Sequence, residues 1–421
     1  MDFPAVSIFA PETWPFSLEL LPQPAYMVGG AVRDAILNRR RQYVDLDFVI
    51  PSNAVKIARA IAQHYKAGFV LLDAERQIAR VVFPHATVDI AQQEGSSLET
   101  DLYRRDFTVN AIAYNPHTQE IIDPVQGYAD LQQRLLRMVS PANLKADPLR
   151  LLRAYRQAAQ LDFTIEPATQ ATIRDLASHI CEVAAERVRV EIGYLLASPQ
   201  GTPWLKTALE DGLLAPLFQN ATNDSCKKIA AVDQAACLLQ ETWQQIGEQL
   251  QTSVRDTVKT TWLAIAKLAC LVHPNPEVAE IELQKLTYSR AEIRSVTTAL
   301  KLFPLVKKPD MSIREQFFFF QEAGSAFSAI AALSLAHDTL VEEICGDMLP
   351  GSYIPLICRY LNPDDLVAHP TQLLNGRDLI IALNISASPL VGKILTEIGV
   401  AQAEAKISTT SEAIAFARLL L

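Results

Sequence analysis

The chain of 421 residues has few cysteines, no closely spaced cysteine pair and no excess of positive charge. Its six cysteines lie far apart without a Cys-x-x-Cys motif, which argues against a thiolate zinc site and favours reduced, buried, structural thiols. The 38 basic and 47 acidic residues give a formal net charge of −9. This balance excludes a protein that coats nucleic acid through a uniformly basic surface, but it permits an enzyme with a local basic groove.

Long apolar runs are also missing. The most apolar stretch, 326–336, is too short to span a bilayer and contains serines. Residues 1–4 lack the basic region and apolar run of a secretory signal, so we expect a cytoplasmic protein with no membrane partner. The apolar share of 49% is that of a globular protein, which excludes disorder over most of the chain. The length corresponds to about three domains.

Strand and helix signals divide the chain near residue 147. Apolar and acidic residues alternate along Val44–Ile50, which predicts a strand with Asp45 and Asp47 on one face. Further short strands are expected at Phe69–Asp73, Ala79–Phe83, Thr87–Ala91 and Ile121–Asp123, around a helix at Ala54–His64. Later periodicity predicts helices at Pro148–Gln160, Pro167–Ala177, Ala185–Leu196, Lys227–Glu248, Val254–Leu271, Ile313–Ala323 and Phe327–Glu343. A small α/β head followed by an all-helical remainder is therefore expected.

Residues 28–34 read Val-Gly-Gly-Ala-Val-Arg-Asp. Gly29 and Gly30 end an apolar stretch and open a predicted helix whose next turn presents Arg33. Glycine lets backbone amides approach phosphate oxygens, and a guanidinium adds a direct phosphate contact. A plain strand–turn–helix connection has the same pattern, so this motif alone leaves the two interpretations balanced.

Asp45 and Asp47 form an Asp-x-Asp pair on the predicted strand. Two carboxylates on one face can hold two Mg²⁺ ions that activate an attacking oxygen and neutralise a triphosphate. A lone Asp-x-Asp also arises by chance as a solvated strand face. The glycine pair upstream favours the metal site.

Residues 104–110 read Arg-Arg-Asp-Phe-Thr-Val-Asn. Arg105, Asp106 and Asn110 have the chemistry to bind a phosphate and a ribose hydroxyl, although a charge cluster at a helix start is the plainer interpretation. The Asp-Pro-x-x-Gly sequence at 123–127 indicates a turn leading into a helix, with a structural role.

The segment 147–156 carries a basic ridge. Asp147 is predicted to cap a helix with Pro148 at its first position. Arg150, Arg153 and Arg156 recur every three residues and share one face of this helix. A solvated basic face is the plainer interpretation, but the helix also needs an apolar face, so the ridge points in one direction.

These motifs, in this order, resemble those of the bacterial class II tRNA nucleotidyltransferases and poly(A) polymerases, members of the DNA polymerase β superfamily. The resemblance also includes Glu-Arg-Val-Arg-Val-Glu at 186–191. It is dense over 26–196, thins through the helical middle, and returns at 374–379 and 389–392. It implies an α+β fold, with a polymerase-β-like nucleotidyltransferase head containing a small mixed sheet and an extended all-α neck, body and tail.

The resemblance also implies domain limits and an RNA partner. The expected domains are a catalytic head at 1–142, a base-recognising neck at 143–200, a body at 201–345 and a tRNA-binding tail at 346–421. The helical modules of such enzymes hold the acceptor stem and T-arm of tRNA through backbone shape.

By similarity, Asp45 and Asp47 are the catalytic metal ligands, Mg²⁺ is the cofactor, and Asp89 is a further candidate ligand. The remaining implied residues bind the incoming nucleotide. They are Gly29, Gly30, Arg33 and Arg105 for the phosphates, Asp106 and Asn110 for the ribose, Asp147 and Arg150 for the base, and Arg153 and Arg156 as further nucleotide contacts.

The implied reaction needs no covalent protein intermediate. An RNA 3′-hydroxyl attacks the α-phosphate of a nucleoside triphosphate, and positioning and charge neutralisation supply most of the acceleration. Asp147 accepts from the cytosine 4-amino group while Arg150 donates to the ring nitrogen and carbonyl. The pair also suits adenine, but uracil and guanine present a carbonyl where Asp147 needs a donor. The pair therefore permits both CTP and ATP as the substrate.

Two departures from the family pattern bear on specificity. Most relatives carry Glu immediately before the base-reading Asp, and Ala146 stands there instead, which bears on the orientation of Arg150. Relatives that add C, C and A carry a long flexible segment before the Arg-Arg-Asp motif, which helps the site switch from CTP to ATP. Here only residues 91–100 separate Ile90 from Asp101. This shortening predicts a CC-adding enzyme, with the final A supplied by a separate A-adding enzyme.

Several alternatives stay open. The nearest is a full CCA-adding enzyme, followed by an A-adding enzyme. A poly(A) polymerase is disfavoured because the C-terminal region is not basic. A catalytically silent RNA-binding relative would have lost Asp45 or Asp47, and both are present.

Two segments have no assigned role. The run Phe317–Phe320 suits base stacking or a helix core, and the core is favoured. Arg39, Arg40 and Arg41 suit either phosphate contact or an exposed turn.

Overall fold

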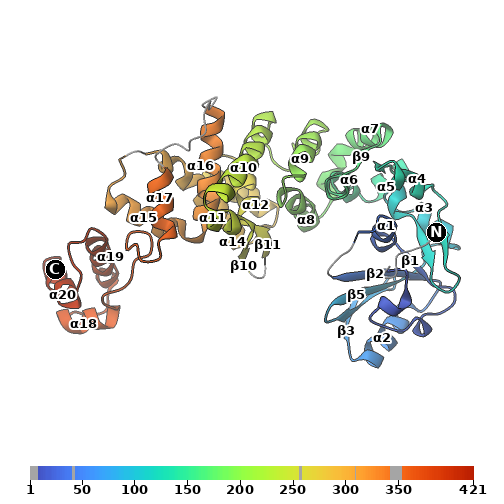
Figure 1. The fold of residues 1–421 in the computed structure, drawn as a ribbon, viewed down its shortest axis with the longest axis horizontal. Coiled ribbons are helices and arrows are strands. Elements are labelled where there is room, and N and C mark those ends of the chain that lie inside the picture. Colours follow the sequence, from blue (N-terminus) through green and yellow to red (C-terminus); the bar gives the residue numbers. More distant parts are fainter. Residues whose placement is uncertain (1–7, 40–42, 256–257, 309, 342–352) are drawn as a thin grey trace. The chain divides into compact units, whose positions relative to one another are not determined.

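The computed structural model describes residues 8–39, 43–255, 258–308, 310–341 and 353–421. These residues form two compact units (Figure 1). The first unit lies within 1–191 and 210–216, and the second within 192–209 and 217–421. The first unit contains a mixed sheet, and the second is mostly helical, which confirms the α+β prediction. The division into head, neck, body and tail stays a prediction.

The sheet of the first unit has seven strands in the order β3-β4-β5-β2-β1-β6-β7. Strands β2 and β5 run parallel and the other neighbours run antiparallel. Because β2 lies between β5 and β1, the strand that carries the two aspartates is interior to the sheet. The strands are β1 (Tyr26–Val28), β2 (Val44–Ile50), β3 (Gly68–Asp73), β4 (Ile78–Phe83), β5 (Ala86–Gln92), β6 (Ala113–Asn115) and β7 (Glu120–Ile122).

Alternation along β2 explains its place in the sheet. Leu46, Phe48 and Ile50 are buried, whereas Asp45 and Asp47 lie on the opposite face. Helix α2 (Ala54–Tyr65, Figure 1) packs on β3, β4 and β5. Its apolar face includes the buried Ile61. Both predictions are confirmed. The three-residue strands β1 and β6 were missed because they are too short to show a period.

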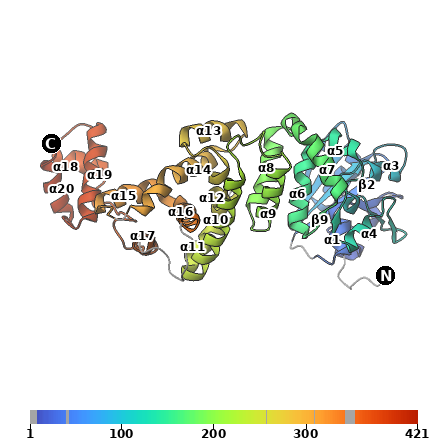
Figure 2. The same ribbon diagram turned by 90° about the horizontal axis from the view of Figure 1, so that it is seen from above.

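Helices cover the rest of the first unit, and Figure 2 shows α5, α6 and α7 side by side. Asp147 was predicted to be the N-cap of α6, but the N-cap is Pro148, because α6 starts at Leu149. Asp147 is the C-cap of α5. The Asp147 carboxylate still accepts from the Leu149 N–H at 3.4 Å. The elements are α1 (Gly30–Ile36), α3 (Leu98–Tyr103), α4 (Gly127–Gln132), β8 (Leu135–Leu136), α5 (Pro141–Ala146), α6 (Leu149–Leu161), β9 (Thr164–Ile165), α7 (Pro167–Leu176) and the shared α8 (Ala185–Leu196), with 3-10 turns η1 (Pro11–Thr13), η2 (Leu18–Leu20), η3 (Thr108–Asn110) and η4 (Ala177–Glu182).

The second unit corrects one predicted helix. Val254–Leu271 is not one helix, since β10 (Ser253–Arg255) and β11 (Val258–Thr261) form a hairpin before α12 (Trp262–Leu271). The β-branched residues in β11 favour a strand over a helix. The other elements are α9 (Gly201–Glu210), α10 (Asn223–Thr242), α11 (Gln244–Gln251), α13 (Pro276–Lys285), α14 (Arg290–Leu302), η5 (Phe303–Lys307), α15 (Ile313–Ala323), η6 (Gly324–Ala326), α16 (Phe327–Val341), α17 (Tyr353–Leu361), α18 (Gly376–Leu383), α19 (Pro389–Ala403) and α20 (Thr410–Arg418).

A further predicted helix is broken in two, some helices were missed, and one predicted helix end is not tested. The predicted helix Lys227–Glu248 is broken at Trp243 into α10 and α11. Helices α13 and α14 were missed, although Ser289 and Glu292 form a capping box that marks the start of α14. The predicted end of α16 at Glu343 lies outside the described residues.

Apolar packing holds the second unit together. Every residue of α12 is buried, and this helix packs against α10, α14 and α16. Phe317, Phe319 and Phe320 are buried and Phe318 is 37% exposed, which confirms the core interpretation of the phenylalanine run. The continuous helical stretch Ile313–His337 is long and apolar enough to cross a membrane, but 72% of its apolar window is buried inside the protein, as in a core helix.

The expectation of buried cysteines was only partly correct. Cys226 and Cys270 are buried, but Cys181, Cys237 and Cys358 are exposed and free. Cys345 lies outside the described residues.

Candidate active site

A tight turn between β1 and α1 places the backbone of Gly29 and Gly30 close to charged side chains. Gly29 has φ +72°, and a Cβ there would lie 3.3 Å from Arg105 Nη1 and 3.6 Å from Asp47 Oδ2. A Cβ on Gly30 would lie 3.5 Å from Arg33 Nη2. A larger residue at position 29 would be strained by its φ and would crowd both charged groups. Five predicted site residues therefore lie together at this turn: Gly29, Gly30, Arg33, Asp47 and Arg105.

Asp45 and Asp47 lie on the same face of β2. Asp45 Oδ1 accepts from the Thr87 hydroxyl at 2.5 Å, and neither carboxylate forms an ion pair with another described residue. Burial and the carboxylates of Asp45 and Asp89 raise the pKa of Asp47 to about 6, although Arg105 and Arg80 act in the opposite direction. Crowded carboxylates without a cationic partner suit a divalent metal that prefers oxygen ligands.

Asp89 lies beside this pair but has its own partner. The strand register sets Asp47 opposite Asp89, and Asp89 opposite Arg80. Arg80 donates from Nε and Nη2 to the two carboxylate oxygens of Asp89 at 2.7 and 2.8 Å. Within the part of the chain that is described, no group of three or more His, Cys, Asp or Glu side chains is arranged to hold a metal. A ligand role for Asp89 would have to use the lone pairs that its two oxygens keep beside the bonds to Arg80.

A buried hydrogen-bond network joins the Gly-Gly motif to the Arg-Arg-Asp motif. Arg33 is 7% exposed and donates from Nη1 to Asn110 Oδ1 at 2.6 Å. Its Nη2 lies 2.8 Å from Asp34 Oδ1 in an ion pair. Asn110 in turn donates from Nδ2 to Asp106 Oδ1 and Gln157 Oε1, each at 2.9 Å. The residues predicted to hold phosphate and ribose are thus parts of one connected network.

Asp106 is the anionic centre of this network. Arg153 Nε lies 2.9 Å from its Oδ2, and the Phe107 N–H donates to its Oδ1 at 2.8 Å. Burial by itself raises the pKa of Asp106, but the charge of Arg153 and the hydrogen bonds from Asn110 and Phe107 outweigh it and leave the pKa below its ordinary value. Asp106 therefore stays ionised at neutral pH and acts as an acceptor.

Arg105 links this network to the turn at Gly29. Its Nη2 lies 3.2 Å from Asp101 Oδ2, and its Nη1 donates to the Asn110 carbonyl at 3.4 Å. Its Nε–H is buried without a hydrogen-bond partner. This donor is therefore available to a ligand or an ordered water.

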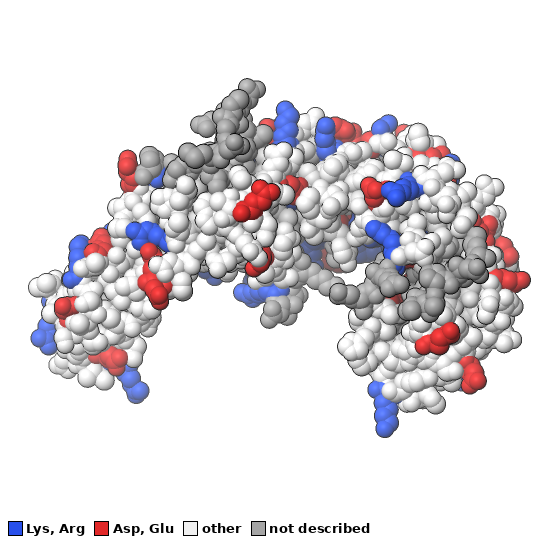
Figure 3. Space-filling view, viewed as in Figure 1, with Lys and Arg blue, Asp and Glu red and all other residues white. Residues whose placement is uncertain are grey.

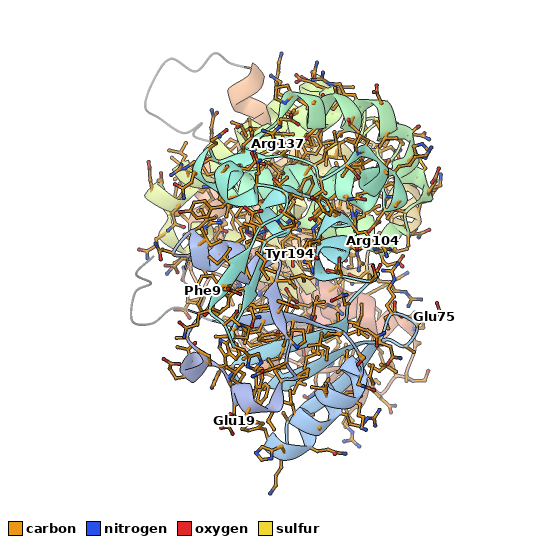
Figure 4. The ribbon with its side chains drawn as sticks, turned by 90° about the vertical axis from the view of Figure 1, so that its right-hand side faces the viewer. Phe9, Glu19, Glu75, Arg104, Arg137 and Tyr194 are labelled. Atoms are coloured by element: carbon orange, nitrogen blue, oxygen red, sulfur yellow. The ribbon has the colours of Figure 1, made fainter. Side chains whose placement is uncertain are left out.

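The segment between β5 and α3 is short and tied down. Strand β5 ends at Gln92 and α3 begins at Leu98, so only 93–97 connects them. The Glu94 N–H donates to Asp101 Oδ1 at 3.0 Å, and the Glu94 carboxylate pairs with Arg104, which is labelled in Figure 4. Ser97 caps α3 by accepting from the Thr100 N–H. Both halves of the segment are therefore attached to α3 or to the residue that follows it.

Asp147 and Arg150 lie at the junction of α5 and α6 and are held by different partners. Arg187 donates from Nη1 and Nη2 to the two oxygens of Asp147 at 3.2 and 2.9 Å. Arg150 donates from Nη1 to the backbone carbonyls of Arg104 and Asn143, each at 3.0 Å. The predicted base-reading groups are thus oriented by the protein itself.

The basic ridge on α6 separates into different contacts. Arg153 forms an ion pair with Asp106. Arg156 Nε lies 2.5 Å from Glu191 Oε2, and Arg156 Nη1 donates to Gln160 Oε1 at 2.7 Å. Each arginine of the ridge has a partner in the protein, but Arg153 stays exposed, so the ridge is partly solvated. Arg156 is bonded to Glu191 and Gln160 rather than to Asp106. Arg39 Nη2 donates to the Gln160 carbonyl at 2.8 Å, while Arg40 and Arg41 lie outside the described residues.

Sequence reasoning missed several members of the site. Gln157 lies one helical turn after Arg153 on α6, so this spacing could have identified it. Arg80 alternates with the buried positions of β4, but its pairing with Asp89 follows from strand register rather than from any local signal. Asn143 acts through contacts with a segment distant in the sequence, and no local pattern marks it. Arg187 lies in the motif 186–191, but its pairing with Asp147 follows only from the fold.

Family models match three parts of the chain. The poly A polymerase head domain matches residues 25–137, the RNA and SrmB-binding site of polymerase A matches 162–224, and the tRNA nucleotidyltransferase domain 2 matches 256–417. The first match contains the glycine turn, both aspartates and the Arg-Arg-Asp motif.

Relatives match nearly the full length. A CC-adding tRNA nucleotidyltransferase of Synechocystis is 49% identical over 408 residues, which cover 96% of this chain and 96% of that protein. One from Geobacter sulfurreducens is 32% identical over 400 residues, covering 92% of this chain and 90% of that protein. A solved CCA-adding enzyme in its apo form has the same fold, with a TM-score of 0.69 over 94% of this chain and 90% of that one, at 20% identity.

Proposed function

Since the chain belongs to the bacterial-type tRNA nucleotidyltransferases, we propose that it adds two C residues to the 3′ end of tRNA from CTP, without a template and with two Mg²⁺ ions. The observation that carries the choice of CC addition is the short segment 93–97 before α3. The near-full-length likeness to proteins named CC-adding supports the same choice.

The segment 93–97 has little freedom to rearrange the site. Glu94 is held by Asp101 and Arg104, and Ser97 begins α3. Switching from one nucleotide to another requires two arrangements of the site with comparable free energies. A segment this short, with polar attachments at both halves, supplies few such arrangements, which supports an enzyme that stops after CC.

Asp45 and Asp47 fit the proposed metal site. They offer hard oxygen donors on an interior strand, and Thr87 fixes one carboxylate by its hydrogen bond to Asp45. Bound Mg²⁺ would lower the pKa of the attacking 3′-hydroxyl and neutralise charge on the triphosphate. Arg80 holds Asp89 and thereby limits the negative charge beside the two ligands.

The remaining groups bind the nucleotide. Arg33, Arg105 and the backbone of Gly29 and Gly30 face the triphosphate in this proposal, and Asp106 with Asn110 holds the ribose. The ionised Asp106 accepts from a ribose hydroxyl, since its pKa lies below the ordinary value. Because these groups are already joined by hydrogen bonds, little ordering is required when nucleotide binds.

Base selection is assigned to Asp147 and Arg150. Arg187 occupies one lone pair on each Asp147 oxygen and leaves others to accept from the cytosine amino group. Arg150 uses Nη1 for backbone carbonyls and keeps its other N–H groups for the ring nitrogen and carbonyl. Arg153 adds a cation beside Asp106, and Arg156 pairs with Glu191 through Nε and keeps other N–H groups.

The helical segments are proposed to hold the acceptor stem and T-arm of tRNA. On the face shown in Figure 3, acidic and basic residues are scattered among uncharged ones. Such a surface suits recognition of RNA shape at a few contacts more than a continuous electrostatic track. We place this activity in the cytoplasm, where a separate A-adding enzyme would complete the tRNA.

The test uses purified protein, Mg²⁺ and tRNA transcripts ending at the discriminator base, at C or at CC. Products with CTP, ATP or both are resolved to the nucleotide. We expect the first two transcripts to stop at CC under every condition that includes CTP. The Asp45→Asn/Asp47→Asn double variant, purified in the same way, controls for contaminating host enzyme.

Other outcomes identify the alternatives. Products ending in CCA would contradict CC addition and indicate a full CCA-adding enzyme. Extension of only the CC transcript with ATP would indicate an A-adding enzyme, and long A tails would indicate a poly(A) polymerase. Binding of tRNA without any extension would indicate a non-catalytic RNA-binding relative.

A further inference from the structure

The end of α3 exposes consecutive backbone carbonyls that need donors. The last carbonyls of an α-helix have no later N–H in the same helix to accept from. Helix α3 ends at Tyr103, immediately before Arg104 and Arg105. The carbonyls of these three residues all accept hydrogen bonds from the side chains of two residues in the segment 143–150.

Asn143, within α5, supplies two of the three contacts. Its Nδ2 donates to the Tyr103 carbonyl and to the Arg105 carbonyl, each at 2.8 Å. An Asn amide has two N–H groups, so both are used. The Asn143 side chain thus bonds the residues on both sides of Arg104. It attaches α5 to Arg105, whose guanidinium lies beside Gly29 and Asp47.

Arg150 supplies the third contact, and the Asn143 side chain acts on it through the backbone. The Arg150 Nη1 donates to the Arg104 carbonyl, and Asn143 holds the carbonyls on either side of it. The same Nη1 donates to the backbone carbonyl of Asn143, which a substitution of the Asn143 side chain leaves in place. Ala146 offers only a methyl group before Asp147, so no side-chain carboxylate at that position can orient Arg150.

The geometry points to Asn143 as a positioning residue that sets the guanidinium of Arg150 for base selection. This inference rests on the proposed function, in which Arg150 contacts the base. Asn143 acts through Arg150 and the backbone of 103–105, so its removal changes which nucleotide is chosen more than how fast the favoured one reacts.

A purely structural role for Asn143 makes a different prediction. If Asn143 only satisfies the end of α3, its substitution lowers folding stability and reduces the use of every nucleotide by a similar factor. The ratio of kcat/KM values for two nucleotides separates these roles, because a common loss of active protein cancels in the ratio.

The experiment compares Asn143→Ala with Ser140→Ala in the full chain. Ser140 caps α5 and accepts from the Asn143 N–H at 3.3 Å, so Ser140→Ala weakens the same helix but keeps the Asn143 amide. Values of kcat/KM for CTP and UTP are measured with Mg²⁺ and tRNA that lacks its CCA end. We expect Asn143→Ala to lower the CTP-to-UTP ratio about tenfold or more. Ser140→Ala should leave this ratio unchanged.

Two further variants keep the test decisive. Asn143→Asp has the same shape without the N–H donors, so it is expected to lose selectivity as Asn143→Ala does, and it serves if the Ala variant does not fold. In an Arg150→Ala background, Asn143→Ala should change the ratio no further, because no guanidinium is left to orient.

The outcomes distinguish this inference from the function on which it rests. An unchanged CTP-to-UTP ratio in the folded Asn143 variants, or an additive effect in the Arg150→Ala background, would overturn the role of Asn143 alone. A wild-type enzyme without preference for CTP over UTP, or an Arg150→Ala enzyme with full preference, would overturn the proposed base reading and this inference with it.

Discussion

The two units bury different kinds of side chain. Among the described residues, the charged side chains buried in the first unit outnumber those in the second, where only Lys267 and Glu292 are buried. Each buried acid of the first unit has an arginine partner. The buried charges of the first unit are Arg33, Asp34, Asp106, Asp130, Glu191 and Asp211.

This difference shows where each unit obtains its order. Buried ion pairs contribute little net stability but fix geometry, because a misplaced partner leaves an uncompensated charge. In the first unit two of these pairs, Arg33–Asp34 and Arg153–Asp106, lie in the candidate site. Arg137, which is labelled in Figure 4, pairs with both Asp130 and Glu166. In the second unit, burial of apolar helix faces such as α12 supplies the stability.

The largest expected effect separates activity from stability within the first unit. Asp47→Asn removes a proposed metal ligand, so we expect activity to fall more than about a hundredfold. The same change should stabilise the metal-free fold. The pKa of Asp47 rises from its ordinary 3.8 to about 6 on folding, so the folded state loses stability as the pH rises through this interval. Ionised Asp47 thus costs about 3 kcal/mol at most at neutral pH.

Thermal unfolding without divalent metal checks this prediction. Asp47→Asn should melt higher than the wild type at about pH 8, and the difference should shrink at about pH 5. Added Mg²⁺ should stabilise the wild type and leave the variant unmoved. A variant that melts lower than the wild type at both pH values would contradict the account of Asp47 as a strained carboxylate.

The next largest effect concerns Lys267, which is buried in the second unit. Lys267 Nζ lies 2.6 Å from Asp233 Oδ1 and donates to Thr202 Oγ1 at 3.1 Å. Lys267→Met leaves Asp233 without its cation and should lower the free energy of unfolding by about 3–5 kcal/mol. The activity per folded molecule should stay unchanged, because the contact lies entirely in the second unit.

Denaturant unfolding together with active-site titration measures both quantities. The double variant Lys267→Met/Asp233→Leu is the matched control, since removal of both charges should recover most of the lost stability. A large loss of activity per folded Lys267→Met molecule would contradict the expectation that this ion pair affects only the stability of the second unit.

A smaller effect is expected from Gln157→Leu in the first unit. The Asn110 amide loses one acceptor in the buried network, which should cost about 1–3 kcal/mol of stability. Because Asn110 and Asp106 lose part of their alignment, KM for the nucleotide should rise more than kcat falls. Steady-state kinetics test this, and Gln160→Leu on the same helix serves as the more exposed control.

The smallest effect is expected from Phe318→Ala in the second unit. The ring is 37% exposed and lies 5.4 Å from the Arg314 guanidinium carbon, so its loss should cost under about 1 kcal/mol. Binding of tRNA should not change if the phenylalanine run is core. A marked loss of tRNA affinity in a stably folded Phe318→Ala protein would instead support base stacking.

Sequence reasoning succeeded where structure is set by neighbours along the chain. Period-two alternation identified β2 and its acidic face, and period-3.6 patterns identified α2 and α6 to within a residue or two. It failed at Val254–Leu271, where apolar spacing was compatible with a helix but β-branched residues form a hairpin. Periodicity alone does not distinguish these outcomes over short stretches.

The sequence by itself determined the chemical parts of the site, because motif spacing places two carboxylates on one strand face and arginines along one helix face. Only the tertiary structure decided which groups meet. Arg80 neutralises Asp89, Arg187 holds Asp147, and Asn143 bonds the Tyr103 and Arg105 carbonyls through contacts set by strand register and helix packing. Such contacts join residues far apart in the chain, so local sequence patterns do not predict them. Each group needs its partner because a buried polar group without one is unsatisfied.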